Sequence, residues 1–300
     1  MKKWNAASKI GNVLKETYKG YMDDKGLKLS AALSYYTIFS LPPLLIIIIS
    51  LSGIFFGADT VKNQIFGQIN GLVGNGAALQ MQEIMKNVKF SSTNAFATAL
   101  AIIILLIGAS GVFSEIQSSI NHIWGIKTKP KHSLMKFMYD RLMSFSMIGS
   151  VGFLLLVGLV VNSLIDVLNK RLMIVFPQDA IVLFQVINTI IVFIIIALLF
   201  AIIFKILPDG RIGFRDCIIG ASFTACLFMI GKFIISIYLG RNNIASIYGA
   251  AGSIILILAW VYYSAAILYF GAEFTKVYAH THGREIIPNS YSAVSERQND

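Results

Sequence analysis

Charged side chains inside long apolar stretches are the residues of this sequence that could do chemistry. Lys232 lies in the second half of one apolar stretch, and Glu115 and Glu273 stand at the ends of two others. A charge in hydrocarbon is costly, and side chains that keep one there usually serve a substrate or ion path. The pattern predicts a fixed positive charge at Lys232, suited to an anionic group, with the two carboxylates at the opposite end of the path.

Each of these three side chains also has a plainer interpretation. Lys232 can extend to the outer headgroups, and Glu115 and Glu273 can be solvated helix ends or partners of a nearby Lys or Arg. At 1.5 Å per residue, Lys232 and Glu273 differ in depth by about 20 Å or more, which excludes a direct salt bridge. Tyr35 and Tyr36, at the start of the first apolar stretch, lie at the depth of the carboxylates and could face them.

Three further side chains are candidates for the wall of a cavity. Asn121 follows Glu115 where the second stretch reaches the inner interface, Tyr248 opens the last stretch, and Trp260 lies near its midplane. Trp260 is therefore away from the interfacial positions that aromatic residues favour in membranes. A cavity wall and helix packing both account for Trp260, and packing is the simpler account.

Hydrolytic chemistry has little support in the sequence. Metal-dependent phosphodiester hydrolysis needs clustered His and carboxylate ligands, and the histidines are scattered, at His122, His132, His280 and His282. No nucleophile motif of the G-x-S-x-G kind occurs either. The sequence predicts no enzymatic activity, no metal site and no cofactor.

Long apolar helices must position the candidate residues. Hydrophobic residues make up 56% of the sequence and charged residues 13%, and about 20 apolar residues cross a bilayer as a helix. Six stretches come close to or exceed that length, at residues 31–57, 95–111, 142–165, 181–206, 214–239 and 247–274. They predict an all-α, polytopic membrane domain over residues 27–278.

The first of these stretches contains Pro42-Pro43 near its middle. The missing N–H groups predict that the helix is broken or kinked there, and carbonyl groups freed in hydrocarbon are tolerated only against protein or water. The break therefore lies inside the bundle, where it either lines a cavity or serves packing alone.

The distribution of basic residues predicts the topology. With six spans, 18 of the 25 Lys and Arg residues fall on the side of the two termini, and 6 fall on the opposite side. Basic residues collect on the cytoplasmic side of membrane proteins, so both termini are predicted to be cytoplasmic. The net charge of +10 then reflects topology and attraction to anionic lipid headgroups, and it does not indicate a nucleic-acid partner.

Three segments lie outside the predicted spans. Residues 1–26 have the pattern of an interfacial amphipathic helix with lysines around an apolar face. Residues 58–94 predict two short amphipathic helices on the outer surface. Residues 279–300 are polar without periodicity and predict a disordered cytoplasmic tail.

Long sequence motifs resemble the YihY family of bacterial inner-membrane proteins, also called the virulence-factor BrkB family. They are ALSYYTIFSLPPLL, FSEIQSSINHIWG, GASFTACLFMIGKFIISIYL and IYGAAGSIILILAWVYYSAAILYFGAEF, and the similarity extends over residues 27–278. The resemblance implies a six-helix protein of the bacterial cytoplasmic (inner) membrane with both termini inside. It implies no settled activity, because family members have been labelled ribonuclease BN, linked to serum resistance, or suspected of transport.

The sequence supports two functional hypotheses. The first is a transporter-like protein that moves a small amphiphilic or anionic substrate, lipid included, through a polar cavity. The alternative is a non-transporting envelope-integrity or resistance factor that binds lipid or a partner protein. The ribonuclease label is rejected, because the residues that such chemistry requires are not clustered.

Overall fold

The computed structural model describes residues 6–56, 66, 79, 95–128, 178–241, 252–289 and 292–294. Six helices make up nearly all of these residues, which confirms the all-α class: α1 (Ala6–Asp23), α2 (Gly26–Phe56), α5 (Ala95–Ile123), α7 (Gln178–Ile206), α8 (Phe214–Arg241) and α10 (Gly252–Thr281). The predicted span 142–165 and Tyr248 lie outside the described residues, as does nearly all of the predicted outer segment 58–94.

Three of the described helices contain segments long and apolar enough to cross a membrane. These segments are Thr189–Ile206 in α7, Phe214–Ile234 in α8 and Ile254–Thr281 in α10. They coincide with the last three apolar stretches predicted from the sequence.

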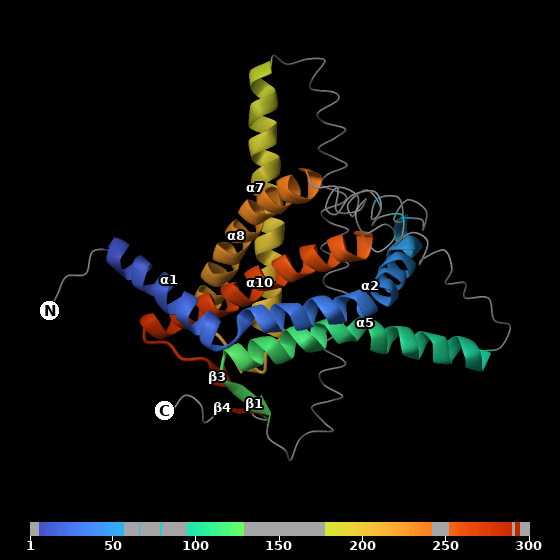
Figure 1. Cartoon of the computed structure of the whole chain (residues 1–300), viewed down its shortest axis with the longest axis horizontal. Coiled ribbons are helices and arrows are strands. Elements are labelled where there is room, and N and C mark those ends of the chain that lie inside the picture. Colours follow the sequence, from blue (N-terminus) through green and yellow to red (C-terminus); the bar gives the residue numbers. More distant parts are fainter. Residues whose placement is uncertain are drawn as a thin grey trace.

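Helix α10 is central to the described bundle. It packs against α1, α2 and α8, while α2 packs against α5 and α7 packs against α8. In Figure 1, α7 runs across the direction of α2 and α5. The most deeply buried side chains include Ile120 of α5, Phe204 of α7 and Tyr269 of α10. The core therefore lies where α5, α7 and α10 come together, at the ends predicted to be cytoplasmic.

The prediction of a break at Pro42-Pro43 is wrong in one respect, because α2 continues as a helix through both prolines. Figure 1 shows that α2 changes direction in its second half. Two adjacent prolines remove two backbone hydrogen bonds, which bends a helix when the flanking turns stay intact. Helix α5 supports the bend, since a Cβ on Gly108 would lie 3.0 Å from Pro43 Cγ and one on Gly111 would lie 2.8 Å from Ser40 Oγ.

Helices α8 and α10 cross through two similar pentapeptides, a feature not predicted from the sequence. GASFT (220–224) in α8 lies antiparallel to GAEFT (271–275) in α10. Each glycine receives the threonine of the other helix: a Cβ on Gly220 would lie 2.8 Å from Thr275 Cβ, and one on Gly271 would lie 2.8 Å from Thr224 Cβ. The two glycines thus allow a close approach of the two backbones.

Hydrogen bonds and ring stacking fix the same crossing. The hydroxyl groups donate backward along their own helices, Thr224 to the carbonyl of Gly220 at 2.7 Å and Thr275 to that of Gly271 at 2.6 Å. The rings of Phe223 and Phe274 stack with centroids 3.8 Å apart. Because every threonine hydroxyl is bonded within its helix, the crossing buries no unsatisfied hydroxyl.

Helix α1 has one buried side and one exposed apolar side. Val13, Thr17 and Tyr21 are buried, and this side of α1 packs on α10. A second apolar row, four residues apart along the helix, is exposed: Ile10, Leu14, Tyr18 and Met22. The helix predicted to lie in the interface therefore also belongs to the bundle.

The segment after α10 differs from the expectation of a disordered tail. Strand β3 (Ile287–Pro288) pairs with β2 (Gly210–Arg211), and β4 (Ser292–Val294) pairs with β1 (Ile126–Thr128), both antiparallel. Ile286 is buried beside these strands. The ordered structure of this segment could not be predicted from its polar composition. Backbone pairing with β1 and β2 stabilises the segment, and such pairing leaves no helical period in the sequence.

Candidate functional site

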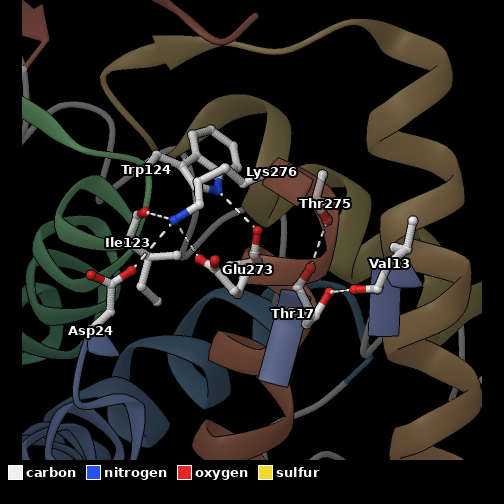
Figure 2. A network of polar contacts seen from close by, with 10 residues as sticks. Val13, Thr17, Asp24, Ile123, Trp124, Glu273, Thr275 and Lys276 are labelled. Carbon is white, nitrogen blue, oxygen red and sulfur yellow. Dashed lines mark hydrogen bonds and ion pairs between the residues drawn. The ribbon is translucent and has the colours of Figure 1, made fainter. Parts of the chain in front are cut away.

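A buried group of charges joins three helices near the end of α10 (Figure 2). Lys276 Nζ lies 2.7 Å from Glu273 Oε2, one turn away on α10, and 3.4 Å from Asp24 Oδ2, just after α1. The same amine donates a 2.7 Å hydrogen bond to the carbonyl of Ile123, the last residue of α5.

The depth of Glu273 depends on a glycine of α1. Only 2% of Glu273 is exposed, and its Oε1 occupies the place that a Cβ on Gly20 would take. A carboxylate so far from water is stabilised only when a cation accompanies it. Lys276 is that cation, and Gly20 leaves the room for the pair beneath α1.

Trp124 completes this junction from the side of α5. Its Nε1 donates a 3.1 Å hydrogen bond to the carbonyl of Ala272, and 3% of the residue is exposed (Figure 2). Trp124 therefore lies in the core, where its N–H group has a hydrogen-bond partner.

A second buried polar group holds the turn between α7 and α8. Asn121 Nδ2 donates to Asp209 Oδ2 at 2.8 Å, Gln117 Nε2 donates to Asp209 Oδ1 at 3.1 Å, and Asp209 N donates to Asn121 Oδ1 at 2.8 Å. Only 1% of Asp209 is exposed. Asn121, predicted as a cavity residue, therefore fixes the α7–α8 turn against α5.

A third polar contact attaches the tail to α8. Arg284 Nη1 lies 2.9 Å from Oδ1 of Asp216, which is fully buried in the first turn of α8. The Asn289 N–H group donates a 2.9 Å hydrogen bond to the carbonyl of Asp209. The tail is thus bonded both to α8 and to the turn that precedes it.

Glu115 lies apart from these ion pairs. It follows the apolar stretch 95–111, is partly buried, and accepts a 3.3 Å hydrogen bond from Ser119 Oγ one turn further along α5. Burial raises the pKa of Glu115 above its usual value, and the bond from Ser119 opposes this shift. Glu115 and Glu273, predicted to lie at the same end of the path, therefore have separate partners in the described residues.

Lys232 is exposed in the second half of α8. Its neighbour Gly231 lies against the hydroxyl of Tyr263. Along the axis of α10, Lys232 is therefore at about the same depth as Tyr263. Tyr263 precedes Glu273 by ten residues, or about 15 Å along a helix. The axial separation is smaller than the sequence suggested, and it is still too large for a direct salt bridge.

The aromatic candidates are placed outside this polar junction. Tyr35 and Tyr36 are 61% and 46% exposed, and their rings contact each other with centroids 5.9 Å apart. Trp260 is half-buried and packs edge-on against Phe228 with centroids 6.2 Å apart. Trp260 thus contributes to the α8–α10 packing, and the side chain of Pro42 lies outside the described residues.

Three acidic residues that bind distant parts of the chain were not predicted as site residues: Asp24, Asp209 and Asp216. All three occur at turns or in the first turn of a helix, where an acidic residue is ordinary. The signal that could have found them is their position beside the predicted inner ends of apolar stretches. Among the residues that the structure describes, no group of three or more His, Cys, Asp or Glu side chains could hold a metal ion.

Long apolar helices packed around buried ion pairs define a helical membrane protein with several candidate spans. Residues 17–293 match the family described as Virulence factor BrkB, and the chain belongs to this family. Its resemblance to that family in sequence motifs is thereby confirmed.

Named relatives agree with the membrane assignment. A "UPF0761 membrane protein" of Psychromonas ingrahamii is 30% identical over 251 residues, covering 81% of this chain and 79% of the relative. Another from Saccharophagus degradans is 24% identical over 92% of this chain and 62% of its own length. A third, from Mannheimia succiniciproducens, is 23% identical over 87% of both chains. No solved structure matches the chain.

Proposed function

We propose that this protein moves an amphiphilic or anionic molecule, lipid included, across the bacterial cytoplasmic membrane. The proposed topology has six spans and two cytoplasmic termini, which the 18 to 6 division of Lys and Arg residues supports. The proposal assigns the protein no enzymatic reaction, no cofactor and no nucleic-acid partner.

The buried charges around Glu273 carry this proposal. A chain that needed only to pack in a membrane would gain nothing from a carboxylate that is 2% exposed, because desolvating an ion pair costs several kcal/mol per ion. Ionisable groups retained at such a cost in membrane helices usually serve a path for ions or substrates. Lys232, about 15 Å away along the helix pair, supplies positive charge at a second level of the path.

Accessibility of position 232 tests whether a water-filled path exists. A single cysteine replaces Lys232 in a chain whose Cys217 and Cys226 are changed to Ser, and membrane-impermeant thiol reagents are added from each side. A path that opens alternately predicts labelling from both sides. Phe233→Cys, exposed and adjacent on the apolar surface of α8, is the matched control and is expected to resist both reagents.

Movement of lipid can be measured directly in vesicles that contain the purified protein. The probe is a fluorescent phosphatidylglycerol whose inner-leaflet fraction is protected from a reducing agent added outside. The proposal predicts faster loss of protected fluorescence with the protein present than in empty vesicles. Glu273→Gln is expected to slow this loss. Equal rates with and without the protein would contradict the movement of this lipid.

The alternative, a non-transporting envelope factor, is favoured by a different observation. The exposed apolar row of α1 that begins at Ile10 lies beside the exposed side chains of Lys15 and Lys19. An apolar row beside lysines suits an anionic lipid surface. If position 232 resists reagents from both sides, lipid binding through α1 becomes the better account.

A further inference from the structure

Glu115 is partly buried and, unlike Glu273 and Asp216, forms no ion pair with a cationic side chain among the described residues. Lys276 accompanies Glu273, and Arg284 accompanies Asp216. Among the described residues, no Lys, Arg or His forms an ion pair with Glu115, and its bonded neighbour is the neutral hydroxyl of Ser119. A partly buried carboxyl group with only neutral neighbours loses hydration when it ionises, so the protonated form is favoured.

A tyrosine hydroxyl of the neighbouring helix α10 lies near Glu115. Tyr269 of α10 is fully buried, and its hydroxyl lies within electrostatic reach of Glu115, Ser119 and Tyr21. The hydroxyls of Tyr269 and Tyr21 have no hydrogen-bond partner among the described residues. A hydroxyl can donate to a carboxylate and accept from a carboxylic acid, so it can serve Glu115 in either state of protonation.

Among the described residues, the charged groups on the helices next to this cluster are engaged in an ion pair or exposed to solvent. On α10, Glu273 and Lys276 form their own ion pair one turn beyond Tyr269. On α5, His122 is exposed two turns from Glu115, about 10 Å along the helix axis. On α2, Ser30 is neutral and donates to the carbonyl of Gly26.

We infer that Glu115 is a proton-binding site, which takes up one proton on its carboxylate and releases it without any other bond changing. The neutral hydroxyls of Ser119 and Tyr269 lie at this site and accommodate both forms. The role of this proton rests on the proposed function, in which Glu115 supplies the coupling proton for substrate movement.

Infrared spectroscopy of the full-length protein in detergent tests the site without any substrate. The carbonyl band of a protonated carboxylic acid is followed while pH is raised in sodium-free buffer. The band is expected to persist above the pH at which exposed carboxyls ionise. It is expected to be lost in Glu115→Gln and retained in Glu16→Gln, a change at an exposed carboxyl of α1.

Ser119→Ala provides a second variant that keeps the carboxyl group. The hydroxyl of Ser119 donates to Glu115 and so stabilises its ionised form. Its removal is expected to shift the disappearance of the band to higher pH. A merely structural role for Ser119 would leave the pH of that transition unchanged.

Three results would overturn the inference. The band could be absent from the wild type, survive in Glu115→Gln, or vanish in Glu273→Gln, which would move the site to α10. Loss of the band on adding sodium at fixed pH would show that Glu115 binds a metal cation in place of the proton. Because titration requires no transport, an intact band with unmoved lipid would refute the proposed function and leave the proton site standing.

Discussion

The crossing of α8 and α10 makes Gly271 the position where one methyl group should matter most. A Cβ at Gly271 would lie 2.8 Å from Thr224 Cβ and also 2.8 Å from Thr224 Cγ2. Thr224 cannot turn aside easily, because it is β-branched and its hydroxyl is bonded to the carbonyl of Gly220 at 2.7 Å. Gly271→Ala must therefore push the two helices apart.

The sign of the effect follows from two opposing contributions. Alanine in place of glycine inside a helix stabilises by up to about 1 kcal/mol. Overpacking a close contact costs about 1–3 kcal/mol. We expect Gly271→Ala to lower the free energy of unfolding by about 1–2 kcal/mol on balance, with a similar loss for Gly220→Ala.

Gly11→Ala is the matched control, because the same change occurs in a helix where a Cβ would meet nothing within 4 Å. Its unfolding free energy should stay unchanged or rise by about 0.5–1 kcal/mol. The assay is thermal unfolding of the purified variants in one detergent, compared by the temperature of the midpoint. Opposite shifts at Gly271 and Gly11 are expected.

A second substitution checks that the loss comes from this contact. Thr224→Ala removes Oγ1 and Cγ2, and leaves only the Cβ at 2.8 Å, so it should partly restore Gly271→Ala. The coupling between the two changes should reach about 0.5 kcal/mol or more, as expected for side chains in contact. A midpoint for Gly271→Ala that rises as in Gly11→Ala would refute the close approach of α8 and α10.

Three other substitutions test the polar groups. Asn121→Asp places a second carboxylate against Asp209 and removes the hydrogen bond that Nδ2 donates to it, which should destabilise the protein by about 1–3 kcal/mol in thermal unfolding. Arg284→Ala leaves the buried Asp216 unpaired, so limited proteolysis should cleave the tail sooner than in the wild type, and unchanged cleavage would argue against that attachment. Trp124→Phe removes one hydrogen bond to α10 and should cost about 1 kcal/mol, while an unchanged midpoint would mean that the bond contributes nothing.

The sequence by itself determined the class of protein and the position of its main elements. The predicted stretch 214–239 became α8 (Phe214–Arg241), and 181–206 became α7 (Gln178–Ile206). Both are identifiable because an apolar run of such length has few alternatives to a membrane helix. The family was likewise recognisable from contiguous motifs, which need no knowledge of the fold.

Polar candidates were predicted with mixed success, for a reason that lies in the chain's topology. Glu273 and Glu115 stood out because each is a charge at the end of an apolar run. Asp24 did not, since its partner Lys276 lies 252 positions away. No local pattern records a contact of that kind, and a turn aspartate looks the same whether or not a lysine comes to meet it.

Only the tertiary structure decided which side of each helix packs and what meets there. In a soluble helix the buried side is marked by apolar periodicity, but a membrane helix is apolar toward lipid and toward its neighbours alike. The sequence therefore has no apolar periodicity that would predict the α8–α10 crossing. Small residues such as Gly220 and Gly271 are the sequence feature that indicates it. The sequence determined that these helices belong in a bilayer, and the packing of small residues and buried charges decided how they assemble.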